Sequence, residues 1–166
     1  MKKTSITKTL LEAAAGIAGG VIGTMVVQQL TKLGGKLPQR FQARMKRDPH
    51  EVVLGGIEKL AQRPLGEKAR ARLKPLLPFT YGTAGPLVLG LFARRLGQRS
   101  IGRVIAAGTV MGAFVWAVGY LGWLPLSGAA EPIHRQRVEA TANSLLGHAV
   151  YGAVSSLPIA LVERYV

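Results

Sequence analysis

Four long stretches of the chain contain no charged side chain, and this feature constrains the fold more than any other. The stretches are residues 13–31, 75–93, 104–130 and 140–162, and charged residues are crowded between them. A helix rises about 1.5 Å per residue, so each stretch is long enough to cross most of the roughly 30 Å hydrocarbon core of a bilayer. The pattern predicts an all-α integral membrane protein, with a single membrane domain over residues 1–166.

Four transmembrane helices are predicted, and they are short and rich in glycine. Their bounds, taken from the uncharged stretches, are about residues 10–30, 76–92, 104–123 and 143–162. The chain has 21 glycines, many of them inside these helices. In a helix exposed to water each would cost about 1 kcal/mol relative to alanine. In a bilayer the backbone cannot bond to water, so the helix persists, and glycine lets neighbouring helices approach closely.

Three G-x-x-x-G pairs lie in the first and third predicted spans, and this spacing is typical of helix–helix contacts. The glycines that form them are Gly16, Gly19, Gly20, Gly23, Gly108 and Gly112. Three such pairs provide more packing surface than four short helices need among themselves. We therefore expect a homo-oligomer or a complex with other membrane protein subunits.

A basic insertion over residues 48–75 separates the first two spans. Its sequence Asp48-Pro49-His50-Glu51 predicts a helix start, because Asp48 can cap the helix and Glu51 can complete a capping box. A second short helix is expected at about Glu67 to Lys74, with cations all round it. We predict two amphipathic surface helices in the headgroup region. A helical hairpin that stands free in water is the alternative.

The chain is strongly basic, with 22 Lys and Arg against 8 Asp and Glu and a formal net charge of +14. Nucleic-acid phosphates and anionic lipid headgroups both favour such a charge. The apolar stretches favour lipid, so no nucleic-acid partner is predicted. The density of cations in the short loops favours cytoplasmic termini, whereas their total number favours the opposite orientation. The predicted headgroup ligands are Lys68, Arg70, Arg72, Lys74, Arg94 and Arg95.

Groups suited to catalysis are scarce in the predicted spans. No aspartate or glutamate lies in the middle of a span, and Glu12 is expected at headgroup level near Lys8. The three histidines are far apart in sequence and the chain has no cysteine, so no metal site is predicted. Trp116, Tyr120 and Trp123 fall toward the end of the third span, where aromatic rings favour the membrane interface. We predict no catalytic residue, no resident cofactor and no enzymatic activity.

A polar stripe is predicted in the fourth span. Ser144, His148, Tyr151 and Ser155 are spaced by four, three and four residues, so they share one helix face. Polar side chains in lipid turn inward to find partners. Three roles are open. The stripe can fix packing through an interhelical hydrogen bond, His148 can act as a proton-sensitive switch, or His148 can be an axial ligand of a tetrapyrrole.

Two segments of the predicted spans carry a family resemblance. Ala14–Thr24 is rich in glycine and alanine, and the fourth span contains the motif His148-x-x-Tyr151-Gly152. In these features the chain resembles the YagU-like family, small bacterial inner-membrane proteins of unknown function. The family element in the second span is also His-x-x-Tyr-Gly, whereas this chain has Pro78-x-x-Tyr81-Gly82. The resemblance implies a multi-pass protein of the bacterial inner membrane and brings no assigned catalytic residues.

The function that these features favour is non-enzymatic. Abundant small-residue faces and scarce catalytic groups favour a structural or accessory subunit of a larger inner-membrane complex, or of a homo-oligomer. A small transporter or channel is the alternative, because Pro86 would kink the second span and the polar stripe could line a path. A tetrapyrrole-binding subunit that uses His148 is a weaker alternative.

Overall fold

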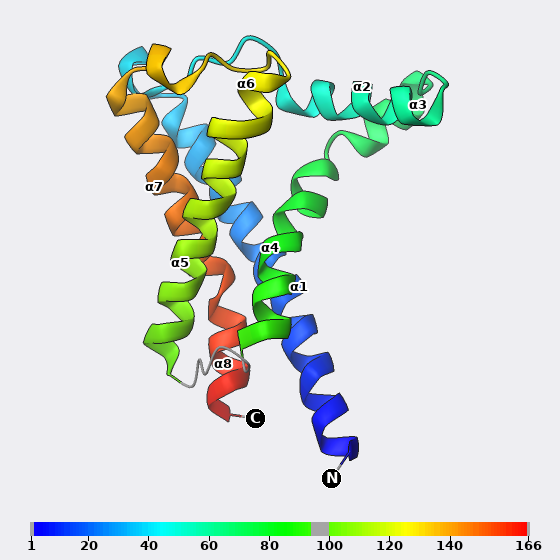
Figure 1. The fold of residues 1–166 in the computed structure, drawn as a ribbon, viewed down its shortest axis with the longest axis vertical. Coiled ribbons are helices and arrows are strands. Elements are labelled where there is room, and N and C mark those ends of the chain that lie inside the picture. The colour runs from blue at the N-terminus through cyan, green and yellow to red at the C-terminus, as the bar shows by residue number, and fades with distance from the viewer. Residues whose placement is uncertain (1, 94–99, 166) are drawn as a thin grey trace.

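The structure is a computed structural model, and it describes residues 2–93 and 100–165, which form helices joined by loops (Figure 1). Between α5 and α6 lies a π-helical segment, η2 (Val118–Trp123), and short 3₁₀ turns occupy η1 (Gln39–Phe41) and η3 (Ile133–Arg135). The α-helices are α1 (Lys2–Gly34), α2 (Pro49–Ala61), α3 (Glu67–Leu73), α4 (Leu77–Ala93), α5 (Ile101–Ala117), α6 (Leu124–Leu126), α7 (Val138–Ser155) and α8 (Leu157–Tyr165).

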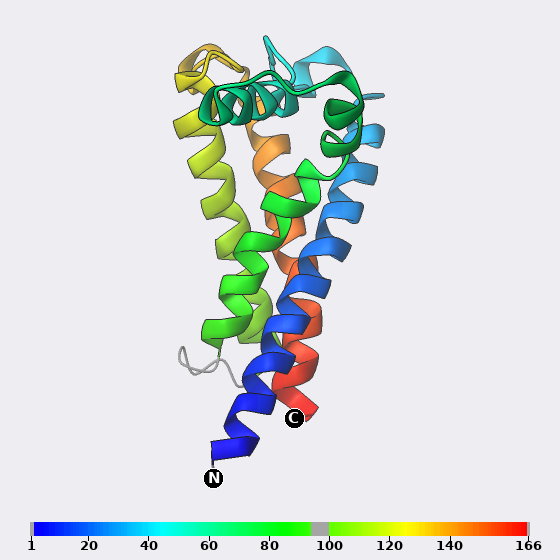
Figure 2. The ribbon, with the colours of Figure 1, turned by 90° about the vertical axis from the view of Figure 1, so that its right-hand side faces the viewer.

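Four segments are long and apolar enough to cross a membrane, which confirms the predicted fold class. They are Ile6–Gly34, Glu67–Ala93, Ile101–Leu126 and Val138–Tyr165. Their long helices stand side by side, and α1 begins and α8 ends at the same end of the bundle (Figure 1, Figure 2). The chain is an all-α membrane protein. The first, third and fourth segments are longer than the predicted spans, because their helices continue through flanking residues that include charged ones. The second segment is longer only because it includes α3, and α4 itself closely matches the predicted 76–92.

The long helices pack in the order α4, α1, α7 and α5, and a smaller contact between α4 and α5 closes the bundle. Near the termini, α8 continues the path of α7 and contacts both α1 and α5. A hydrophobic core lies at this end of the bundle. Its buried members are Ala15, Leu89, Ala93, Val104, Ile159 and Ala160.

One glycine pair of α1 faces α4. A Cβ added to Gly16 would lie 2.6 Å from the carbonyl oxygen of Pro86, and one added to Gly20 would lie 2.6 Å from the Cα of Thr83. Both distances are well inside van der Waals contact, so the backbones of α1 and α4 touch through these glycines. Pro86 lies inside α4 and is buried in this contact.

The second glycine pair of α1 faces α7 instead. A Cβ on Gly19 would overlap the carbonyl oxygen of Ser155, and a Cβ on Gly23 would overlap the Ser155 hydroxyl oxygen. Three residues span slightly less than one helical turn, so the two pairs point about 60° apart, which is enough for them to meet two adjacent helices. α1 therefore uses one glycine-rich segment to contact two helices at once.

The glycine pair of α5 also faces α7. A Cβ on Gly112 would overlap the carbonyl oxygen of His148, and a Cβ on Gly108 would overlap that of Gly152. All six glycines singled out in the sequence thus lie at contacts within the chain. These three pairs are covered by helices of the same chain. They therefore provide no free packing surface on which an oligomer could be predicted.

Prolines explain two departures from the predicted spans. In η2 the N–H of Leu124 bonds to the carbonyl of Gly119, a shift of one residue from the α-helical pattern. Pro125 has no N–H to continue the pattern, and Gly122 adopts a non-helical conformation with φ −108° and ψ −106°. At Ser156 the fourth span breaks into α7 and α8, just before Pro158.

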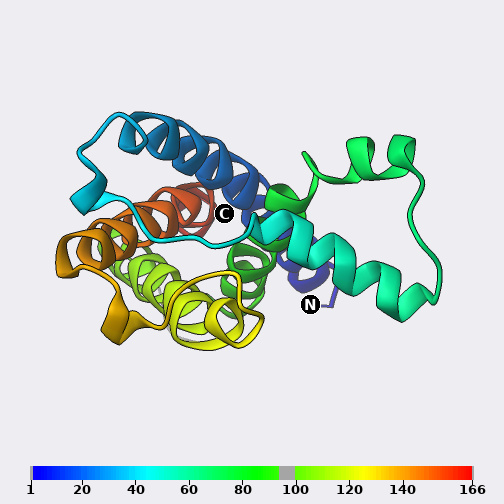
Figure 3. The same ribbon diagram turned by 90° about the horizontal axis from the view of Figure 1, so that it is seen from above.

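The loops at the end of the bundle away from the termini are tied together. The connection from α1 to α2 runs across this end (Figure 3). The N–H groups of Lys46 and Arg47 bond to the carbonyl of Ala129 at 2.8 and 3.2 Å. Arg44 pairs with Glu131 at 3.7 Å. These contacts join the first and second halves of the chain outside the spans.

Helices α2 and α3 form an arm that projects sideways from this end, roughly perpendicular to the spans (Figure 1, Figure 3). Asp48 caps α2 as predicted, because its carboxylate accepts a hydrogen bond of 2.9 Å from the N–H of His50. The predicted capping box is wrong. The Glu51 carboxylate bonds to Arg70 and Lys74 on the α3 side of the arm instead.

Candidate functional site

The polar stripe of α7 faces the neighbouring helices. Tyr151 and Ser155 are buried, and Ser144 and His148 are half-buried. The sequence could not say which helices the stripe contacts. In the structure, Tyr151 and Ser155 lie against α4 and α1, and Ser144 lies against α5.

Tyr151 joins α7 to α4. Its hydroxyl donates a hydrogen bond to the carbonyl oxygen of Gly82. The absence of a side chain on Gly82 also admits Thr24 of α1, because a Cβ at this position would overlap the Thr24 hydroxyl oxygen. Three spans therefore meet at Gly82, and two of them present a hydroxyl group there.

Ser155 and Thr24 place buried hydroxyl groups against glycines. Neither hydroxyl oxygen has a hydrogen bond of normal geometry among the described residues. Each lies where a Cβ would stand on a glycine of the facing helix, Gly23 for Ser155 and Gly82 for Thr24. This placement suits weak Cα–H···O contacts, which recur between closely packed helices.

His148 is bonded to its own helix. Its Nδ1 lies 2.9 Å from the carbonyl oxygen of Ser144. A carbonyl only accepts, so Nδ1 carries the proton of this bond and the tautomer is fixed. The His148 ring packs edge-on against Tyr120, with 6.0 Å between the ring centroids. An aromatic side chain of η2 thus occupies space beside the imidazole.

Trp116 of α5 and Tyr120 of η2 extend this cluster. Their rings stack with centroids 5.7 Å apart, and the Trp116 Nε1 donates a 3.2 Å hydrogen bond to the Ser144 hydroxyl. Trp116 is only 8% exposed, so its side chain packs inside the bundle. Helical spacing carried the signal that was missed, because Trp116 lies four residues after Gly112 and shares its inward face.

Glu12 was expected at headgroup level, but it is 2% exposed. It lies on α1 where the backbone of that helix meets Gly90 of α4. A carboxylate buried between spans is costly in a membrane protein and is a mark of functional or structural importance. Within the described residues, no group of three or more His, Asp or Glu side chains could hold a metal ion.

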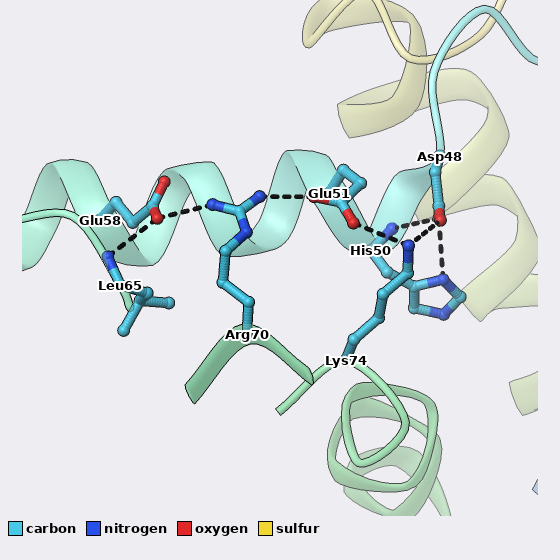
Figure 4. A network of polar contacts seen from close by, with 7 residues as sticks. All are labelled: Asp48, His50, Glu51, Glu58, Leu65, Arg70 and Lys74. Atoms are coloured by element: carbon cyan, nitrogen blue, oxygen red, sulfur yellow. Dashed lines mark hydrogen bonds and ion pairs between the residues drawn. The ribbon is translucent and has the colours of Figure 1, made fainter. Parts of the chain in front are cut away.

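The predicted headgroup ligands of α3 divide between two faces. Lys68 and Arg72 are exposed. Arg70 faces α2 and bridges Glu58 at 2.6 Å and Glu51 at 2.5 Å (Figure 4). Arg94 and Arg95 lie outside the described residues.

Lys74 completes the network between α2 and α3. Its ammonium lies 2.7 Å from the Glu51 carboxylate and 2.9 Å from that of Asp48 (Figure 4). The Lys74 ammonium, and then the Arg70 guanidinium, hold the pKa of Glu51 below its usual value. Lys74 likewise lowers the pKa of Asp48. All these carboxylates are therefore ionised and paired at neutral pH.

Comparison with known proteins assigns neither a family nor a function to this fold. No family model, curated protein or solved structure matches the chain. The resemblance to the YagU-like family rests on its two short motifs and stays a prediction.

Proposed function

We propose that the chain is a non-enzymatic structural or accessory subunit of a bacterial inner-membrane assembly. The proposal rests on one observation: the small and polar residues inside the bundle make contacts between its own helices. Glycine brings backbone against backbone at the α1–α4, α1–α7 and α5–α7 contacts. The stripe residues Ser144 and Tyr151 hydrogen-bond to neighbouring helices. The interior therefore serves packing.

In this proposal a partner contacts an outward face, because the glycine faces are occupied within the chain. The spans present large apolar side chains outward, which lipid or another membrane helix can cover equally well. Met25 of α1, Phe114 of α5 and Leu146 of α7 each represent one such face, with exposed fractions of 55%, 67% and 62%.

Photocrosslinking from these three positions in native membranes, with mass spectrometric identification, tests the proposal. A photoreactive residue at Met25, Phe114 or Leu146 should crosslink one recurring membrane protein, or a second copy of the chain, from one face and not from all. Extraction in mild detergent should recover the same partner. Lipid adducts alone from all three faces, with the chain emerging alone and monomeric, would contradict the accessory role.

A further inference from the structure

In the arm, the charged groups between α2 and α3 pair with one another, and the charged groups on the outside are mainly basic. Asp48, Glu51 and Glu58 of the α2 side all bind Arg70 or Lys74 of the α3 side. These five groups face one another between the two helices (Figure 4). Their charges therefore contribute little to the outward field of the arm.

The remaining cations of the arm point outward. Lys68 and Arg72 are four residues apart, so they share the face of α3 that is turned away from α2. Lys59 and Arg63 at the far end of α2 are also exposed. None of these four forms an ion pair with a described residue. The exterior of the arm is thus strongly basic, with Glu67 as its exposed carboxylate.

One face of α2 is apolar and turned toward the membrane-spanning part of the molecule. His50 marks this direction, because its Nε2 lies 3.3 Å from the hydroxyl of Tyr81 on α4. Val53, Ile57 and Leu60 follow at helical spacing on the same side of α2, and Leu60 is 88% exposed. Lys59 points to the opposite side of the helix.

The position of the arm matches the boundary of a bilayer. It extends perpendicular to the spans from the end where they stop (Figure 1, Figure 2). Its apolar face is continuous with the outward face of α4, where Tyr81 and Val88 are each more than half exposed, as is Leu76 just before this helix. An amphipathic helix with a basic polar face typically binds an anionic membrane surface in this orientation.

We propose that the arm is a binding site for anionic phospholipid headgroups on the surface of the same bilayer. Val53, Ile57 and Leu60 insert about 5–10 Å into the boundary between headgroups and acyl chains. Lys68 and Arg72 bind the lipid phosphates, whereas Arg70 and Lys74 hold the arm together. Charge complementarity and continuity with the lipid-facing spans assign the surface to lipid. The inference does not depend on an accessory role.

Spin labelling of the full chain in reconstituted bilayers tests the depth of the arm. The chain has no cysteine, so Leu60→Cys and Lys59→Cys each provide one labelling site on α2. The two sites point about 100° apart, with Leu60 on the apolar side and Lys59 opposite His50. The ratio of accessibility to oxygen over accessibility to an aqueous nickel chelate should be several-fold higher at position 60 than at position 59. Equal ratios typical of water at both positions would overturn the proposal.

A charge comparison with the Leu60 label tests the headgroup ligands. In bilayers with one part phosphatidylglycerol to two parts phosphatidylcholine, the label should lie deeper than in phosphatidylcholine alone. Lys68→Ala with Arg72→Ala should abolish this difference. Lys32→Ala with Lys36→Ala removes the same charge at the same spacing from the end of α1, and should leave the difference intact. No difference in the unaltered arm, or equal loss in both variants, would refute the assignment.

Discussion

The bundle and the arm are held together by opposite means. In the bundle, backbones meet at glycines such as Gly16 and Gly112. In the arm, two cations and three carboxylates join α2 to α3. The comparison teaches that the solvent selects the kind of contact. Between the spans, helices approach closely through small residues, whereas the arm, which projects from the bundle, is joined by ion pairs.

The largest effect is expected from adding one methyl group to the bundle. Gly112→Ala would place a Cβ on the carbonyl oxygen of His148, so α5 and α7 must separate. We expect a loss of about 1–3 kcal/mol, as for overpacked cores, measured as a lower melting temperature in detergent. Gly147→Ala is the matched control, because nothing lies within 4 Å of a Cβ on this α7 glycine. Equal melting temperatures for both variants would refute the glycine contact.

A smaller effect is expected from the hydrogen bond between α7 and α4. Tyr151→Phe keeps the ring and removes the hydroxyl that donates to the Gly82 carbonyl. Interhelical hydrogen bonds in membranes contribute about 0.6 kcal/mol on average and about 1.7 at most. The same thermal measurement should give a loss in this range. A neutral result would show that the packing of the ring at Gly23 carries the contact.

The arm should respond locally to a change that leaves the bundle intact. Arg70→Ala removes the bridge to Glu51 and Glu58 and should widen the distance between spin labels at Gly55→Cys and Ala71→Cys. The melting temperature of the bundle should not change. Arg72→Ala removes the same charge two residues away on the exposed face, and should leave the label distance as it is. A change of distance in both variants would show that total charge, and not this bridge, holds the arm closed.

The smallest effect is expected from mild acidification. The backbone N–H of Leu65, and then Arg70, lower the pKa of Glu58, and Lys74 lowers that of Glu51. Because the pKa in the folded arm lies below the usual 4.5, the stabilisation is fully present above 4.5 and is lost as the pH falls through the lowered values. Between pH 7 and 5 the label distance should therefore stay constant, and it should broaden only below 4.5. Broadening near pH 6 would mean that another group holds the arm.

Local features of the sequence predicted much of this fold. The length of the uncharged stretches predicted the four spans, and Asp48 predicted the start of α2. Both features depend only on residues that are close in sequence. The choice of partner for each glycine pair was not predictable, since Gly16 and Gly19 differ only in direction and that direction has meaning only once the helices are placed. The π-helical segment needs the combined effect of Gly122 and Pro125.

The candidate sites were predicted less completely. The spacing of Ser144, His148 and Tyr151 predicted their shared face, but the bonds of Ser144 to α5 and of Tyr151 to α4 depend on tertiary packing. On α3 the cations looked equivalent, because sequence does not show which face meets α2. Glu51 and Glu58 lie seven residues apart on one face of α2. Arg70 differs from Arg72 because it binds both of these carboxylates.

The central claim is that the four spans of one chain close on one another, and a disulfide between α4 and α5 tests it most directly. The Cγ of Met111 lies 3.6 Å from the place of a Cβ on Gly85, and the sulfur of a cysteine at position 111 would take about the place of that Cγ. Gly85→Cys with Met111→Cys, oxidised in the bilayer, should yield a crosslink within a single chain that migrates as a monomer. A crosslink found only between two chains, or none at all in the folded protein, would contradict the bundle.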